Sequence, residues 1–351
     1  MVASQQGPCP EGGALTRGEN PYAGFGGVVR GERLVGRQST LKRMREMFAG
    51  GRGSLAIIGE PRIGKSSLAQ ALREWVESKG DAVVLVEINL SADLEPGMDM
   101  ISAVGRELEL GSEPGDSERL YDGYRLLKQH LRAAKKGGRH HTLILDEFDA
   151  VREMAHAQIS LRRLRELLSK PHEYGLSAVL VSRRRIASLE RQISDLSTLD
   201  GVCPSLLIRP LSHQGICDMV SRGWPLESES TALAEQVLQH TGGHPFLSEA
   251  LLFELFEGSS VEDAVSQSAG VFRSYFIHLT NILSEDGLLE TALRLANDQT
   301  VPASEEFAAL IEYGVVKRPG MQSSDHELWA PSFKSYLKLL PRNEQPWPTD
   351  V

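Results

Sequence analysis

The sequence lacks the features that mark membrane, secreted and nucleic-acid-binding proteins. No apolar run approaches the roughly 18 residues of a membrane-spanning helix, and no basic segment followed by an apolar one stands near Met1. The three cysteines, Cys9, Cys203 and Cys217, form no CxxC pair, and so few thiols are typical of a reducing compartment. The net charge of −9 gives no support for non-specific binding to nucleic acid. We therefore expect a cytoplasmic protein that does not bind a membrane.

The chain does contain an α/β pattern, which extends to Pro210. Short apolar runs that are separated by helical segments are typical of buried parallel strands. These runs lie at 54–58, 82–90, 143–145, 178–181 and 206–208. Strands that alternate with helices predict an α/β domain with a parallel sheet covered by helices on both faces.

After Pro210 the pattern is helical. Four helices are expected first, at 212–222, 229–241, 245–257 and 261–268. The chain then predicts helices at 272–283, 286–297 and 304–313, hairpin strands at 314–318 and 327–330, and a last helix at 332–340. Three helices capped by a β-hairpin are typical of a winged-helix domain.

The strongest motif is a P-loop at 59–66, between an apolar strand and a helix. Its glycines let backbone N–H groups surround phosphates, and the helix that follows directs its positive end at them. Lys65 is expected to reach the β- and γ-phosphates of ATP, and the Ser66 hydroxyl to bind Mg²⁺. The expected phosphate-binding residues are Gly59, Glu60, Pro61, Arg62, Ile63, Gly64, Lys65, Ser66 and Ser67.

A second motif, Asp146-Glu147, ends the apolar strand at 143–145. Asp146 is expected beside Mg²⁺, and Glu147 is expected to polarise the attacking water as general base. Without the P-loop, the same pair would be a solvated acidic turn after a core strand.

A polar run, Ser182 to Arg185, follows the fourth strand. In a parallel sheet the carboxyl end of that strand faces the same crevice as the P-loop, so a group there can sense the γ-phosphate. We expect Arg183 rather than Ser182 in this role. A solvated or partner-facing surface is the alternative, and Arg184 or Arg185 acting on the nucleotide of a neighbouring subunit is a third.

These motifs occur in an order that resembles the STAND class of AAA+-related ATPases, over roughly residues 20–340. The resemblance rests on 34–37, the P-loop, Asp146-Glu147, Ser182-Arg183 and 241–247 (Thr-Gly-Gly-His-Pro-Phe-Leu). It implies that Val35, Gly36 and Arg37 line an adenine pocket, and that Pro245 packs on the base. Taken alone, 243–245 would be a loop before a helix with proline at its first position.

The resemblance implies a slowly hydrolysing ATP/ADP switch in signalling or defence. Members of the class also place a histidine beside the phosphates from the winged helix, but residues 329–333 contain none, and His326 has the polar neighbours of an exposed wing tip. The chain ends soon after the expected winged helix and has no N-terminal effector, so we expect self-association or a separately encoded effector protein as partner.

We therefore expect a P-loop NTPase sheet sandwiched by helices, a helical lid and a winged helix. The expected segments are a flexible N-terminal segment (1–26), a P-loop ATPase domain (27–210), a helical lid (211–269), a winged-helix domain (270–341) and a tail (342–351). The first contains many Gly and Pro residues and too little apolar surface to offset its ordering entropy.

Two other functions are compatible with these motifs. A DNA-acting ATPase that resembles origin-recognition initiators or transposition regulators shares the three domains, but the helix expected at 304–313 carries three glutamates and no basic residue, which argues against its entering a DNA groove. The other is a nucleotide-binding scaffold without hydrolysis, which the intact Lys65, Ser66, Asp146 and Glu147 argue against.

Overall fold

The computed structural model describes residues 19–48, 53–80, 82–94, 97–110, 117–193, 199–317 and 327–340. Residues 1–18 of the expected lead-in, the polar turn with His326 and the tail at 342–351 lie outside this part. Within the described residues, no helix combines the length and the apolar character needed to cross a membrane.

The five predicted strands form one parallel sheet in the order β2-β3-β4-β1-β5. The strands are β1 (Leu55–Ile58), β2 (Val83–Asn89), β3 (His140–Asp146), β4 (Leu176–Ser182) and β5 (Ser205–Leu207). All four residues of β1 are buried, because the sheet is covered on both faces. The predicted α/β fold with a parallel sheet is confirmed.

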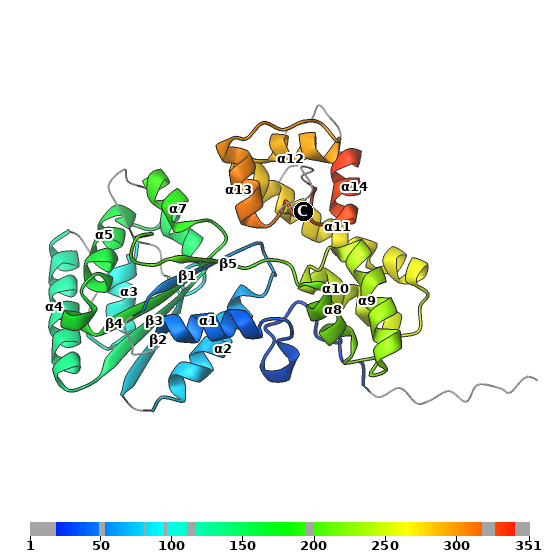
Figure 1. Cartoon of the computed structure of the whole chain (residues 1–351). Helices are drawn as coiled ribbons and strands as arrows, with labels where there is room; N and C mark the ends of the chain where they lie inside the picture. The colour runs from blue at the N-terminus through cyan, green and yellow to red at the C-terminus, as the bar shows by residue number, and fades with distance from the viewer. Residues whose placement is uncertain are drawn as a thin grey trace, which may run out of the picture.

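Helices cover both faces of the sheet (Figure 1), and alternate residues of each strand belong to two different cores. Leu55 and Ile57 pack with α1 (Gln38–Phe48) and α2 (Lys65–Glu77), while Ala56 and Ile58 belong to the core on the opposite face. That second face is covered by α3 (Met100–Glu107), α4 (Ser117–Lys136) and α5 (Ala157–Leu168). Shorter elements complete this domain: η1 (Gly31–Arg33), η2 (Phe148–Glu153), α6 (Pro171–Tyr174) and α7 (Ile186–Ile193).

The rest of the chain is helical and shares one hydrophobic core. Its helices are α8 (His213–Val220), α9 (Glu227–Thr241), α10 (Pro245–Phe256), α11 (Val261–Glu285), α12 (Leu289–Ala296), α13 (Glu305–Tyr313) and α14 (Pro331–Leu339). An antiparallel bridge joins Val316 to Leu328, between α13 and α14. In Figure 1, α11 runs from α8–α10 to the group of α12–α14.

The two helices expected at 261–268 and 272–283 are one continuous helix, so no break in the secondary structure marks the domain boundary expected at 269/270. A glycine inside a helix costs only about 1 kcal/mol relative to alanine. Both halves of α11 bury residues in the same core, including Ala264 before Gly270 and Phe272 after it. This burial outweighs the cost of Gly270.

The segment from 19 to 26 is also different from the expectation, because it packs on the C-terminal helices. Tyr22 is fully buried, and its hydroxyl donates to the carbonyl oxygens of Met219 (2.9 Å) and Val220 (3.0 Å). Phe25 contacts the rings of Phe246 and Phe253 on α10. Two aromatic rings anchor a stretch whose glycine and proline content predicted a flexible lead-in.

Candidate nucleotide-binding site

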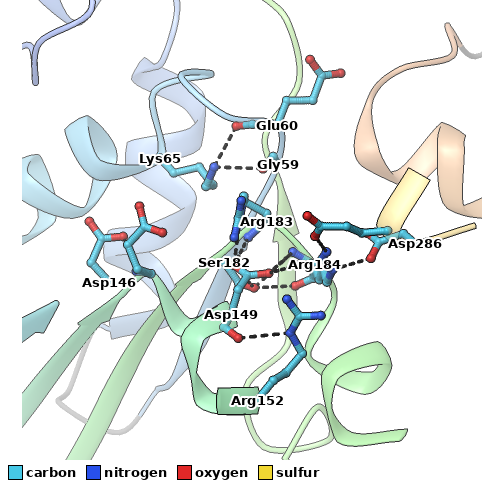
Figure 2. A network of polar contacts seen from close by, with 12 residues as sticks. Gly59, Glu60, Lys65, Asp146, Asp149, Arg152, Ser182, Arg183, Arg184 and Asp286 are labelled. Atoms are coloured by element: carbon cyan, nitrogen blue, oxygen red, sulfur yellow. Dashed lines mark hydrogen bonds and ion pairs between the residues drawn. The ribbon is translucent and has the colours of Figure 1, made fainter. Parts of the chain in front are cut away.

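The P-loop connects the carboxyl end of β1 to the first turn of α2. The Lys65 ammonium donates to the carbonyl oxygens of Gly59 (2.9 Å) and Glu60 (2.7 Å), so it holds the loop closed on itself (Figure 2). Gly64 has a φ of 99°, in the left-handed region that glycine adopts without strain. A Cβ on Gly59 would lie 2.9 Å from the Ile208 carbonyl oxygen. The loop therefore needs both glycines.

The strand that carries Asp146 brings it to the P-loop. The Ser66 hydroxyl donates to Asp146 Oδ2 at 2.9 Å, although 80 residues separate them in the sequence. The predicted convergence of the P-loop with the end of β3 is therefore present in the structure. The Ser66 hydroxyl and the Asp146 carboxylate fit Mg²⁺, which binds one or two protein oxygens and takes its other ligands from phosphate and water.

Glu147 follows Asp146 in a strained backbone conformation, with a φ of 52°. Its N–H donates to Asp146 Oδ1 at 2.7 Å, and its side chain is exposed and lines the cavity described below. A non-glycine residue in this conformation is uncommon and costs about 1 kcal/mol or more. The conformation directs the Glu147 carboxylate away from the core and toward the cavity.

These residues border a cavity of about 980 Å³ between the sheet and the C-terminal helices. Most of the predicted site residues line it: Val35, Arg37, Pro61, Arg62, Gly64, Lys65, Ser66, Ser67, Asp146, Glu147, Arg183 and Pro245. Four do not: Gly36, Gly59, Glu60 and Ile63. These four shape the walls instead.

Gly36 and Arg37 both contact the chain between β5 and the first turn of α8. A Cβ on Gly36 would lie 2.9 Å from Leu211 Cδ2 and 3.0 Å from Gly215 Cα, so its lack of a side chain lets this turn pack against α8. The buried Arg37 guanidinium donates to the carbonyl oxygens of Arg209 (2.8 Å) and Ile63 (2.9 Å). Arg37 therefore ties the P-loop to the segment that leads into the C-terminal helices.

Arg62 connects the P-loop to α10. Its guanidinium carbon lies 4.4 Å from the centroid of the Phe246 ring, within the range of a cation–π contact. Its φ of 56° is a second strained position at this site. Phe246 directly follows Pro245, so both residues at the start of α10 border the cavity.

Two groups of residues that line the cavity belong to none of the sequence motifs. The first is the segment 25–29, in which the Val29 N–H donates to the Ser67 hydroxyl (3.1 Å). The second is one face of α11, which contributes Gly270, Val271, Ser274, Tyr275 and His278. Burial lowers the pKa of His278, and the positive charges of Arg183 and Arg62 lower it further. Spacing along α11 is helical, but no local pattern distinguishes a cavity face from a core face.

The arginines after β4 point in different directions. Arg183 lines the cavity, as expected for a residue that senses phosphate. Arg184 is 2% exposed, and its Nε donates to Asp286 Oδ1 at 2.6 Å. Arg185 Nε lies 2.5 Å from Glu312 Oε2 on α13. Both therefore contact the C-terminal part of their own chain.

Asp149 was missed, although it is the acidic residue nearest to Asp146-Glu147 in the sequence. It lies in η2, is buried, lines the cavity and accepts a hydrogen bond from the Ser182 hydroxyl (3.1 Å). The pKa of Lys65 is lowered to about 8 by burial, and the negative charge of Asp149 opposes this shift more than that of Asp146 or Glu147.

The Glu60 side chain points away from the cavity into a buried polar cluster with Tyr275 and His244. The Tyr275 hydroxyl donates to Glu60 Oε2 at 2.8 Å, and His244 Nε2 lies 3.1 Å from the same hydroxyl. Burial raises the pKa of Glu60 to about 8, while the Tyr275 hydrogen bond and Lys65 lower it. Burial also lowers the pKa of His244 to about 3, so this imidazole is neutral.

Glu60→Gln is expected to make the free energy of unfolding less dependent on pH. Because the folded-state pKa lies above the unfolded value, the protonated carboxyl favours folding below pH 4.5, and this contribution is lost as pH rises to about 8. The loss is on the order of a few kcal/mol. Denaturant unfolding at pH 5.5 and pH 8 measures it, with the exposed Glu46→Gln as control. An unchanged pH slope in Glu60→Gln would contradict the shifted pKa.

Comparisons with known proteins agree with this fold. Residues 46–189 match the family described as AAA domain. A Walker-type ATPase of Pyrococcus abyssi is similar in structure, with a TM-score of 0.58 and 13% sequence identity over 88% of this chain and 97% of that chain. The ORC2 protein of Aeropyrum pernix, in ADPNP–ADP complexes, has a TM-score of 0.49 and 15% identity over 86% of this chain and 93% of that one. No protein of curated function matches the sequence.

At such low identities the structural likeness concerns the fold alone. The family match is independent of it and spans the P-loop, Asp146-Glu147 and the polar run after β4. Both agree with the parallel sheet and with the P-loop position between β1 and α2. The chain therefore has the α/β fold of P-loop NTPases, and its residues 46–189 are similar to the AAA domain family.

Proposed function

We propose that this protein binds ATP with Mg²⁺ in the cavity, hydrolyses it slowly, and acts as a conformational switch between its ATP and ADP states. One observation carries this proposal: the cavity is lined both by Lys65 and Asp146 of the sheet domain and by Pro245 and Tyr275 of the C-terminal helices. A ligand that contacts two groups of elements favours the arrangement in which it contacts both. Loss of the γ-phosphate removes some of these contacts and so changes how strongly the nucleotide favours this arrangement.

The residues present fit hydrolysis. Glu147, whose carboxylate reaches the cavity, accepts a proton from the attacking water. Lys65 and Arg183 offset negative charge on the phosphates. Mg²⁺, held by Ser66 and Asp146, supplies further charge stabilisation when bound. Slow turnover suits a switch, because the rate of hydrolysis sets how long the protein stays in its ATP state.

The STAND resemblance supplies a finer assignment, which we propose on the order of the motifs. It makes α8–α10 with the first part of α11 a lid, and the last part of α11 with α12–α14 and the Val316–Leu328 bridge a winged helix. Under this assignment, the switch serves signalling or defence and controls self-association or the binding of a separate effector protein.

The docking of α13 supports a clamp rather than a DNA reader. Glu312 pairs with Arg185, and the Arg209 guanidinium donates to the Ile311 carbonyl oxygen at 3.1 Å. The carboxyl end of α13 therefore faces the ATPase domain. Its first turn carries Glu305 and Glu306, which would repel a phosphate backbone.

Hydrogen exchange with ATP analogue, with ADP and without nucleotide tests the switch. We expect the amides of α11 near 270–278 to exchange more slowly with the analogue and Mg²⁺, because this face of the helix borders the cavity. Light scattering on the same samples reports self-association. Equal exchange in all three states would contradict a switch, and salt-sensitive retention of DNA with ATP would favour the DNA-acting alternative.

A further inference from the structure

Asp149 organises the turn that follows β4. Its Oδ2 accepts the Arg183 N–H at 2.7 Å and the Ser182 hydroxyl at 3.1 Å, and its Oδ1 accepts the Arg184 N–H at 3.2 Å. Figure 2 shows these contacts converging on one carboxylate. Asp149 is 2% exposed, so little water competes with them. The conformation of this turn therefore depends on Asp149.

One consequence is the position of Arg183 at the phosphate end of the cavity. Arg183 Nε lies 3.8 Å from Asp149 Oδ2, and its side chain is about one quarter exposed, at 27%. Lys65 lines the same cavity as Arg183 and Asp149. Asp149 thus balances two cations that a bound triphosphate would also attract.

The other consequence is the position of Arg184, which points the opposite way. Its Nη1 lies 3.5 Å from Asp149 Oδ1, and its Nη2 lies 3.1 Å from Glu285 Oε2 at the end of α11. Asp286, which follows α11, accepts from Arg184 Nε and from the Tyr313 hydroxyl of α13. Arg184 is therefore a buried cation shared between one carboxylate of the ATPase domain and two of the C-terminal helices.

We propose that Asp149 is a positioning residue that couples the phosphate end of the cavity to the C-terminal helices through Arg184. This inference rests on the proposed nucleotide site. A γ-phosphate competes with Asp149 for the charge of Arg183, so that more of the Asp149 charge acts on Arg184. Arg184 then shifts from Asp286 toward Asp149, and the contact that fixes the end of α11 and α13 weakens. Loss of the γ-phosphate reverses this shift.

Thermodynamic coupling is reciprocal, so the link between the phosphate and the Arg184–Asp286 contact can be measured by changing that contact. If phosphate occupancy changes the Arg184–Asp286 contact, then changing that contact alters the preference for ATP over ADP by the same factor. Asp286 does not line the cavity, so a change at Asp286 reaches the nucleotide only through its neighbours. We expect Asp286→Asn to change the ratio of ATP to ADP affinity by about fivefold or more.

The matched control is Glu312→Gln. It removes the ion pair between α13 and Arg185, which joins the same two parts of the molecule without contacting Asp149. This variant is expected to weaken docking of the C-terminal helices, and its effect on the affinity ratio is expected to be the same in the wild type and in the Asp149→Asn background, because the Glu312–Arg185 pair does not contact Asp149. Tyr313→Phe, which removes the hydroxyl that donates to Asp286, is expected to shift the ratio in the same direction as Asp286→Asn.

A double-mutant cycle completes the experiment, with calorimetric affinities for ATP analogue and ADP in the presence of Mg²⁺. In an Asp149→Asn background, Asp286→Asn is expected to have no further effect on the ratio of ATP to ADP affinity, because the Asp149 charge that couples Arg183 to Arg184 is already absent. Additive effects would overturn the proposal, as would an Asp286→Asn ratio equal to that of the wild type. If Asp149→Asn does not fold, Asp286→Asn and Tyr313→Phe decide alone. Wild-type protein that binds neither nucleotide would instead refute the proposed function.

Discussion

Lys65→Ala is expected to abolish ATP binding, with an affinity at least about hundredfold below that of the wild type. Lys65 is the cation at the centre of the P-loop, and charge-assisted hydrogen bonds to phosphate contribute about 1.5–3 kcal/mol each. Its ammonium also donates to the Gly59 and Glu60 carbonyl oxygens, so its loss leaves these two oxygens of the loop without that donor. Titration calorimetry with ATP and Mg²⁺ measures the effect.

The control for this variant is Lys42→Ala. Lys42 lies on α1, is 79% exposed and has only a weak contact with Glu46 at 4.0 Å, so its removal tests the loss of one positive charge at a distance from the cavity. We expect its affinity to match that of the wild type. Micromolar binding of ATP by Lys65→Ala would contradict the assigned pocket.

Glu147→Gln is expected to bind ATP and accumulate it without hydrolysis. The substitution keeps the size of the side chain and removes its ability to accept a proton, and general base catalysis contributes a factor of about 10²–10⁴ to the rate. We expect binding within a few-fold of the wild type and turnover at least about hundredfold lower. Single-turnover hydrolysis of radiolabelled ATP separates the two quantities.

Glu153→Gln is the matched control, because Glu153 is exposed, lies at the other end of η2 and does not line the cavity. Its turnover is expected to equal that of the wild type. If Glu147→Gln also turned over at the wild-type rate, the base would be another group, and the scaffold alternative would gain support if neither protein hydrolysed ATP.

Local patterns in the sequence sufficed for the sheet and for the phosphate end of the site. A buried parallel strand is a short apolar run, so β1 and β4 are visible without the rest of the chain. The P-loop follows β1 and Asp146 ends β3. Both strands neighbour β4 in the parallel sheet, so their carboxyl ends lie at the same edge. The topology of the sheet therefore places the P-loop and Asp146 in one site.

The opposite wall of the cavity depends on contacts that no local pattern reveals. Tyr275 and His278 have the helical spacing of core residues, and only the path of α11 past the P-loop places them beside Arg62 and Arg183. Likewise, α11 continues through Gly270 because residues on both sides of this glycine are buried in one core.

The partners of the charged residues after β3 and β4 could not be predicted from the sequence. Arg184 and Arg185 belong to a basic run that favours an exposed surface, but each forms an ion pair with a carboxylate more than 100 residues away in the sequence. Asp149 could have been noticed as a second acidic residue after β3, but its role depends on the turn that it stabilises after β4. Pairing across such distances is a property of the folded chain.

The most direct test of the account is to locate a metal–nucleotide complex in a crystal grown with a non-hydrolysable ATP analogue and Mn²⁺ in place of Mg²⁺. The anomalous signal of Mn²⁺ marks the ion independently of the protein. We predict one peak within coordination distance of the Ser66 hydroxyl and near Asp146, with the triphosphate against Lys65. A peak and a triphosphate elsewhere on the molecule would contradict the nucleotide site on which the proposed switch depends.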